Sequence, residues 1–149
     1  MLEKNFWLTV KKNLPKKCLA TRIENRHGGG VPDVHFIWDG LCFWTELKVT
    51  KGYKVNLSPE QIAWNTAYSR LGGINFILVK APRDGNLFLF SGRDSGLVSS
   101  IGIRAPCIYK GNSYNELWGE VRDSGIGILN SGRVGKNSSP DLGGSSIED

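Results

Sequence analysis

Residues 28–48 read GGGVPDVHFIWDGLCFWTELK, and this stretch predicts a β-hairpin. Asp39-Gly40 is a strong hairpin signal, because a type I′ turn needs positive φ at both of its central residues. Apolar residues that favour strands flank the turn, VHFIW before it and LCFWTEL after it. The register that follows pairs residues across the hairpin: Trp38 with Leu41, and Phe36 with Phe43.

The same register places two carboxylates face to face, Asp33 on the first strand and Glu46 on the second. They fall at a non-hydrogen-bonded position, where Cβ atoms lie roughly 4.5–5.5 Å apart. Two negative charges at that distance repel by about 3 kcal/mol at an effective dielectric near 20. Carboxylate oxygens on a rigid hairpin suit Mg²⁺ or Mn²⁺, and Lys48 points to the same face. The alternative is a solvent-facing polar end of the hairpin, with a Glu46–Lys48 pair that contributes almost nothing to stability.

The composition is that of one globular domain. The 149 residues suffice to bury a core, and 40% hydrophobic with 22% charged residues is ordinary for such a domain. A net charge of +5 favours a polyanionic partner. The three cysteines form no C-x-x-C pair, which predicts a reduced compartment without a zinc ribbon or disulfide framework. With no leader pattern and no run of membrane-spanning length, we expect a cytoplasmic protein (in the host cell if viral) with no membrane partner.

The elements predicted around the hairpin complete an α/β domain. Ser58 starts a helix as its N-cap, with Pro59 at the first position and Gln61 at the third. The apolar run at residues 74–79 is typical of a central strand buried on both faces. This order of elements predicts a mixed β-sheet flanked by helices. The other predicted elements are helices at residues 2–13, 97–101 and 112–121, and strands at residues 18–24 and 86–90.

The composition changes at residue 123. From there to residue 149 the chain is rich in Gly and Ser and has little to bury, so we expect a mobile or loosely docked tail. Residues 1–122 would then form the folded domain.

Two basic segments border the candidate site. The segment before the hairpin contains six cationic residues and one acid: Lys11, Lys12, Lys16, Lys17, Arg22 and Arg26, with Glu24. The loop after the hairpin, KGYKVN, contributes Lys51 and Lys54. Such runs are usually a solvated face. Their position beside the paired carboxylates strengthens the alternative that they contact phosphate.

Pro32-Asp33 followed by Glu46-Leu47-Lys48 resembles the motif of the PD-(D/E)XK nuclease superfamily. The surrounding sequence resembles the virus-type replication-repair nuclease (VRR-NUC) group found in phages, which is related to archaeal-type Holliday junction resolvases. The matching segments are TRIEN, GGGVPDV, WTELK and LSPEQ. The resemblance spans residues 21–79 and implies a restriction-endonuclease-like α/β fold, a mixed β-sheet flanked by helices. Nothing from Ala81 onward matches the family.

The resemblance also implies roles for the matched residues. Asp33 and Glu46 would be the metal-binding carboxylates, with the Leu47 carbonyl oxygen as a further ligand. Lys48 would orient the attacking water or stabilise the charge that develops on phosphorus.

Two more positions, Glu24 and Gln61, match the nuclease family, and each also has a purely structural alternative. Glu24 matches an upstream acid that completes the metal site in such nucleases, or it is an exposed glutamate at a strand end. Gln61 matches a glutamine on the helix beside the site, and it also suits a helix cap. The candidate DNA contacts are Arg22, Arg26, His27, Lys51 and Lys54.

The implied activity is Mg²⁺-dependent endonucleolytic hydrolysis of DNA, with Mn²⁺ as a substitute and no small-molecule cofactor. The chain has no base-reading module, which favours selectivity for branched DNA, as in Holliday junction resolution during phage replication, recombination or repair. Two symmetric cuts need a two-fold homodimer. Trp7 and Trp38 are candidates for its interface, with burial in the core as the alternative. Two other functions stay open: a general or sequence-specific DNA endonuclease on the same fold, and a non-catalytic DNA-binding protein.

Overall fold

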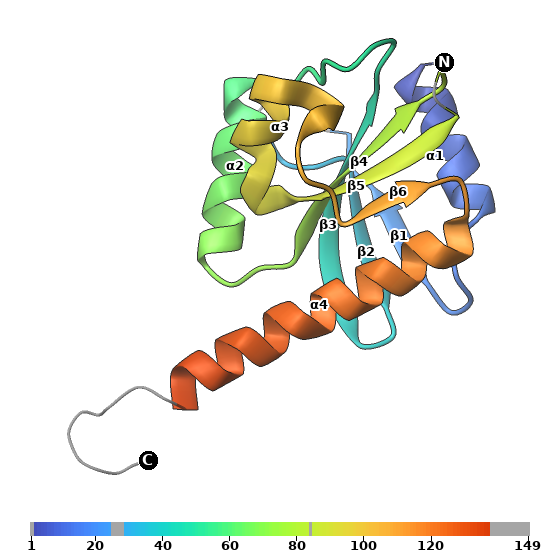
Figure 1. Ribbon diagram of the computed structural model, residues 1–149. Helices are drawn as coiled ribbons and strands as arrows, with labels where there is room; N and C mark the ends of the chain where they lie inside the picture. The colour runs from blue at the N-terminus through green and yellow to red at the C-terminus, as the bar shows by residue number, and fades with distance from the viewer. Residues whose placement is uncertain (1, 25–28, 84, 138–149) are drawn as a thin grey trace.

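A six-stranded β-sheet forms the centre of the fold (Figure 1). The computed structural model describes residues 2–24, 29–83 and 85–137. The strands lie in chain order across the sheet: β1 (Leu19–Arg22), β2 (Val34–Trp38), β3 (Leu41–Val49), β4 (Asn75–Ala81), β5 (Asn86–Ser91) and β6 (Tyr109–Gly111). The helices are α1 (Glu3–Lys12), α2 (Pro59–Arg70), α3 (Ser95–Ile101) and α4 (Tyr114–Asn137), with 3₁₀ turns η1 (Gly92–Asp94) and η2 (Gly102–Arg104).

The strand directions make the sheet mixed. β3 and β4 run parallel and are joined through α2, whereas the other neighbouring strands run antiparallel. A parallel pair needs such a crossover, and here the crossover carries α2 back across one face of the sheet. The predicted α/β class, a mixed β-sheet flanked by helices, is confirmed.

The hairpin forms as predicted. Asp39 and Gly40 have positive φ angles of 51° and 76°, the combination that a type I′ turn requires. The predicted pairs of Trp38 with Leu41 and of Phe36 with Phe43 are both present. The hairpin register therefore follows from its two loop residues.

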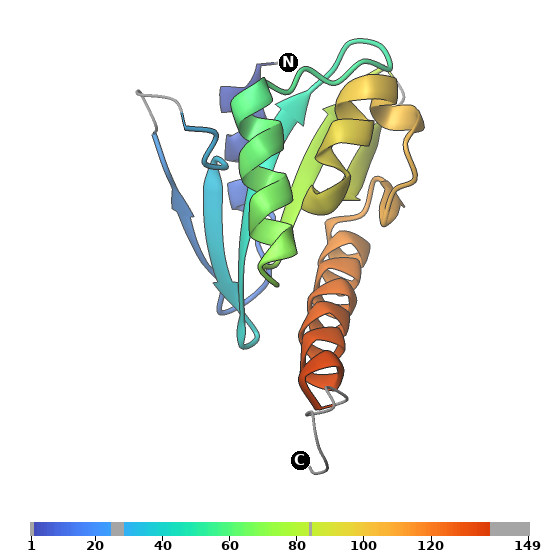
Figure 2. The same ribbon diagram turned by 90° about the vertical axis from the view of Figure 1, so that its left-hand side faces the viewer.

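Two hydrophobic cores lie on opposite faces of the sheet. Figure 2 shows α2 and α3 in front of the sheet and α1 behind it. The core on the side of α1 and α4 includes Phe6, Val10, Phe36, Phe43, Leu78 and Leu117, and the core on the side of α2 and α3 includes Val55, Ile77, Val79, Phe90 and Val98. Trp7 lies in the first core at 8% exposure, so it is a core residue and not part of an exposed interface. Trp38 is half-buried, with its ring 6.2 Å from that of Trp118.

The C-terminal helix corrects the expectation of a Gly/Ser-rich tail from residue 123. The helix predicted to end at residue 121 continues to Asn137, and its second half extends beyond the sheet (Figure 1). Val121 and Gly125 are buried on the face that meets the sheet, and a Cβ at Gly125 would lie 3.0 Å from Leu41 Cδ1. Glycine is therefore used here for close packing. The rest of the predicted tail, residues 138–149, lies outside the described residues.

None of the helices within residues 2–24, 29–83 and 85–137 is both long and apolar enough to span a bilayer.

Candidate active site

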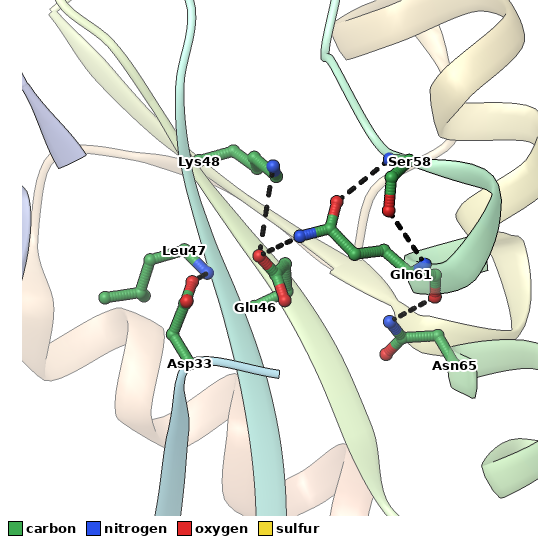
Figure 3. A network of polar contacts seen from close by, with 7 residues as sticks. All are labelled: Asp33, Glu46, Leu47, Lys48, Ser58, Gln61 and Asn65. Atoms are coloured by element: carbon green, nitrogen blue, oxygen red, sulfur yellow. Dashed lines mark hydrogen bonds and ion pairs between the residues drawn. The ribbon is translucent and has the colours of Figure 1, made fainter. Parts of the chain in front are cut away.

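Four of the predicted site residues meet between β2, β3 and α2 (Figure 3). Asp33 immediately precedes β2, Glu46 and Lys48 lie on β3, and Gln61 lies in the first turn of α2. Glu46 and Lys48 share a face of β3 because they are two residues apart. The crossover from β3 to β4 brings the start of α2 onto that face.

Glu46 is the buried centre of this site, with only 1% of its surface exposed. Its Oε2 accepts a hydrogen bond from Gln61 Nε2 at 3.0 Å and lies 3.9 Å from Lys48 Nζ. Its Oε1 is buried and has no hydrogen-bond partner among the described residues. A buried carboxylate oxygen is normally paired. The alternative of a solvent-facing Glu46–Lys48 pair is therefore wrong.

The surroundings of Glu46 disfavour its charged form. Loss of hydration on burial, followed by the negative charge of Asp33, raises the pKa of Glu46 to about 9, and the opposing charge of Lys48 offsets this only in part. A neutral acid is the form that a site without a cation favours. A divalent cation next to Oε1 would reverse this preference.

Asp33 is held in place by the backbone of the opposite strand. Its Oδ2 accepts a hydrogen bond of 2.9 Å from the Leu47 backbone N–H. The hairpin pairing ends at Val34 with Thr45, so Asp33 lies one residue beyond the paired strand. The predicted facing of Asp33 and Glu46 agrees with their electrostatic coupling. The Leu47 carbonyl oxygen stays a predicted ligand.

Gln61 both caps α2 and contacts Glu46. Ser58 Oγ accepts from the Gln61 backbone N–H at 3.1 Å, and Gln61 Oε1 accepts from the Ser58 backbone N–H at 3.0 Å, which completes a capping box. Because Oε1 of Gln61 accepts the hydrogen bond from Ser58, the Gln61 side chain must present its Nε2 to Glu46. The capping box thus determines which end of the Gln61 amide reaches the site. The Gln61 amide binds Oε2 of Glu46, and Oε1 of Glu46 has no partner among the described residues.

The donor set fits a divalent cation. The Asp33 carboxylate and the unpaired Oε1 of Glu46 are hard oxygen ligands of the kind that Mg²⁺ and Mn²⁺ prefer. Among the described residues, no group of three or more His, Cys, Asp or Glu side chains could hold an ion. The remaining ligands would therefore be backbone oxygens, water or substrate, as is usual for Mg²⁺.

The predicted phosphate-binding residues are distributed unevenly around this centre. Lys54 and Lys48 line one cavity together with Gln61. Arg22 is exposed on β1, and Lys51 lines a different cavity. Glu24 is exposed after β1 and is not brought into a three-carboxylate cluster. The predicted contacts Arg26 and His27 lie outside the described residues.

Two further residues shape the site, Glu3 and Gly30. The negative charge of Glu3, at the start of α1, adds to the rise in the pKa of Glu46. Gly30 has φ +77°, and a Cβ there would lie 2.0 Å from the Glu60 carbonyl oxygen. Glycine is thus required for the close approach of this loop to α2, beside a cavity of about 170 Å³ lined by Asp33 and Gln61. The run of three glycines was the signal that a close approach occurs here.

The fold and the site together define an α/β domain with a buried acidic centre and a neighbouring lysine at one end of a mixed sheet. No protein-family model matches the chain, and no curated protein matches it. Among solved structures, the chain is similar to that of Hjc from Archaeoglobus fulgidus, described as a Holliday junction resolvase from an archaeal hyperthermophile. The two are 18% identical, the match covers 61% of this chain and 74% of that one, and the TM-score is 0.46.

Proposed function

We propose that the protein is a divalent-metal-dependent nuclease that hydrolyses DNA phosphodiester bonds. The observation that carries the proposal is the buried Glu46, whose Oε1 has no partner among the described residues and which lies next to Asp33 and Lys48. A structural role would not require a buried oxygen without a hydrogen bond. The resemblance of Pro32-Asp33 and Glu46-Leu47-Lys48 to the PD-(D/E)XK motif supports the same chemistry.

Asp33 and Glu46 would hold the cation, Mg²⁺ or Mn²⁺, with the Leu47 carbonyl oxygen as a further candidate ligand. When bound, such an ion lowers the pKa of water and neutralises charge on the phosphate. Lys48, whose Nζ lies 3.9 Å from Glu46 Oε2, is positioned to orient water or to stabilise the negative charge that develops on phosphorus. Gln61 keeps Oε2 of Glu46 engaged, which leaves Oε1 to the cation.

We propose DNA as the substrate, with branched DNA preferred. The net charge of +5 supports a polyanionic partner. Symmetric cutting of a junction requires a two-fold homodimer. The paired, exposed residues Leu19 (62%) and Ile37 (43%) on the outer strands offer an apolar surface for it. Such an activity would serve DNA replication, recombination or repair, and the resemblance to VRR-NUC proteins suggests a phage as the setting.

A cleavage assay tests the proposal directly. Labelled four-way junction, flap, splayed and linear DNA of matched sequence are incubated at equal salt with Mg²⁺, Mn²⁺ or EDTA. We expect cutting with either metal, none in EDTA, and paired symmetric cuts in the junction. Equal cutting of linear duplex would replace branch selectivity with general endonuclease activity, and sequence-dependent positions would indicate a sequence-specific enzyme. No cutting of any substrate in Mn²⁺ would overturn the nuclease proposal in favour of a non-catalytic DNA-binding protein.

Metal binding is measured separately by calorimetric titration of the wild type and the Glu46→Gln variant with Mn²⁺. We expect binding by the wild type and at least tenfold weaker binding by the variant. Equal binding by both proteins would remove Glu46 from the metal site.

A further inference from the structure

A second cavity, of about 480 Å³, lies on the side of the sheet that α3 and η2 cover. Three cationic side chains and a tyrosine line it, and none of its lining residues within the described part of the chain is acidic. We call it the basic cavity, and its residues are Lys51, Gly52, Tyr53, Ala81, Arg83, Ile103 and Arg104. Arg83 and Arg104 lie outside the segment that resembles nucleases.

The basic cavity adjoins the candidate active site across one short loop. Residues 51–53 of that loop line the basic cavity, whereas Lys54 lines the cavity that also contains Lys48 and Gln61. Since a chain spans at most about 3.6 Å per residue, the Cα atoms of Lys48 and Lys51 are no more than about 11 Å apart. Lys48 and Lys51 therefore lie within the length of about three base steps of duplex DNA, at a rise of about 3.4 Å per step along the helix axis.

The loop is held rigidly. The buried Thr50 hydroxyl donates to the Lys54 carbonyl oxygen at 2.5 Å, and the Ile103 backbone N–H donates to the Tyr53 carbonyl oxygen at 2.8 Å. Gly102 has φ +66°, and a Cβ there would lie 1.9 Å from the same Tyr53 oxygen. The loop can therefore dock on η2 only because residue 102 is glycine.

Arg104 is also positioned before any ligand binds. Its guanidinium lies 3.8 Å from the centroid of the Tyr53 ring, a cation–π contact that restricts the side chain. Within the described part of the chain, no carboxylate forms an ion pair with Lys51, Arg83 or Arg104. Three exposed cations that share a cavity repel one another. A phosphate group would remove that repulsion, and an ordered guanidinium is well suited to bind it.

We propose that the basic cavity binds a backbone phosphate of the DNA a few nucleotides from the bond that is cut. This inference rests on the proposed function and extends it, because it assigns the neighbouring stretch of the substrate to Lys51, Arg83 and Arg104. The contact positions the DNA without reading its sequence. The rigid loop between the two cavities would set the spacing between the clamped phosphate and Lys48.

DNA binding without cleavage tests the inference. Fluorescence anisotropy in EDTA gives the Kd of a labelled duplex at several salt concentrations for the wild type and the triple variant Lys51→Ala/Arg83→Ala/Arg104→Ala. The matched control is Lys11→Ala/Lys12→Ala/Lys16→Ala, which removes the same charge from exposed positions. The sequence placed this segment beside the candidate site, but α1 runs away from the 51–54 loop, so the end of α1 and the loop after it lie toward the other end of the sheet (Figures 1 and 2). Circular dichroism and melting temperatures confirm that each variant folds.

We expect the cavity variant to bind at least about tenfold more weakly than the control. Its slope of log Kd against log salt should be smaller than that of the wild type by about 1, near 0.9 for the one phosphate contact that is lost. Equal affinity and slope for the two triple variants would overturn the inference. Gly102→Ala keeps every charge but displaces the loop, and we expect it to weaken binding as well; wild-type affinity in a folded Gly102→Ala protein would count against a preset clamp.

The test of the basic cavity can fail or succeed independently of the test of the nuclease activity. Metal-dependent cutting by the wild type with equal binding by both triple variants would leave the nuclease proposal standing and the clamp rejected. Salt-dependent binding that is lost only in the cavity variant, without cutting in Mn²⁺, would establish the phosphate site on a non-catalytic protein.

Discussion

Two buried polar side chains face α2 from neighbouring strands, and they differ in how fully they are hydrogen-bonded. Asn75 on β4 is 2% exposed; its Nδ2 donates to Asn65 O and Oδ1 at 3.0 and 2.9 Å, and its Oδ1 accepts from Ser69 Oγ at 2.7 Å. Glu46 on β3 is 1% exposed, and one of its carboxylate oxygens has no partner within the described chain.

The difference separates a structural polar group from a functional one. Asn75 ties the end of α2 to the sheet, and nothing remains for a ligand to satisfy. Glu46 is buried at a cost that only a cation or a proton can offset. Residues at functional sites commonly violate the rules that the rest of a protein obeys.

The largest expected effect is on catalysis. Replacing Glu46 by Gln keeps the size of the side chain but removes the charge that binds the cation. We expect cleavage to fall about 10³-fold or more, equivalent to about 4 kcal/mol of transition-state stabilisation, with DNA binding retained. Asp33→Asn and Lys48→Ala should also abolish measurable cutting. Single-turnover cleavage and anisotropy on the same DNA provide the two readouts, and full activity of Asp33→Asn would refute the carboxylate assignment.

The next effect concerns stability and pH in the metal-free protein. The folded state raises the pKa of Glu46 to about 9, above the unfolded value near 4.5. The stability that this group contributes is therefore complete below pH 4.5 and is lost as pH rises toward 9, by about 1.4 kcal/mol per pH unit. By pH 7 the loss is about 3 kcal/mol.

Urea unfolding in EDTA from pH 5 to 8 measures this loss, with Glu46→Gln as the reference because it cannot titrate. We expect the variant to become the more stable protein as pH rises, and Mg²⁺ to stabilise only the wild type. If the unfolding free energies of both proteins changed with pH in parallel, the charged form of Glu46 would not be disfavoured in the metal-free folded state.

Replacement of Asn75 should have the opposite pattern of effects, with a loss of stability and little change in cleavage. Asn75→Ala leaves Ser69 and Asn65 without their partner in a buried site. We expect a loss of about 2–3 kcal/mol in unfolding free energy, measured by urea denaturation. Cleavage should stay within about threefold of wild type at a temperature where the variant is folded, because Asn75 makes no contact with Glu46 or Asp33 in the described network. A hundredfold loss of activity would extend the site to Asn75.

The sequence predicted those parts of the molecule that depend on local rules. Asp39-Gly40 determined the hairpin register, and Ser58, Pro59 and Gln61 determined the start of α2. The contact between Gln61 and Glu46 could be suggested only by resemblance, because it depends on how the crossover places α2 against β3. A contact between side chains on separate elements, such as this one, cannot be predicted from a short stretch of sequence.

The length of α4 was missed for a different reason. Glycine and serine lower helix propensity, so the segment after residue 122 was expected to lack structure. Leu117, Val121, Gly125 and Ile128 nevertheless recur at helical spacing on the face that packs against the sheet. Tertiary packing overrides propensity here, and Gly125 counts as a packing position even though it has no side chain.

The smallest effect separates the two roles of Gln61. Ser58→Ala removes the side-chain half of the capping box while Gln61 can still reach Glu46, and we expect a loss of about 1 kcal/mol in stability with near-normal cleavage. Gln61→Glu keeps a residue that suits a capping box, but it replaces the amide donor with a third carboxylate, beside those of Glu46 and Asp33. We therefore expect stability close to that of the wild type at pH 5 and cleavage reduced about tenfold at pH 7, partly recovered at higher Mg²⁺. Urea denaturation and single-turnover rates for both variants decide the matter. If Ser58→Ala loses as much activity as Gln61→Glu, Gln61 acts on the site only through the cap; if neither changes the rate, its hydrogen bond to Glu46 has no catalytic consequence.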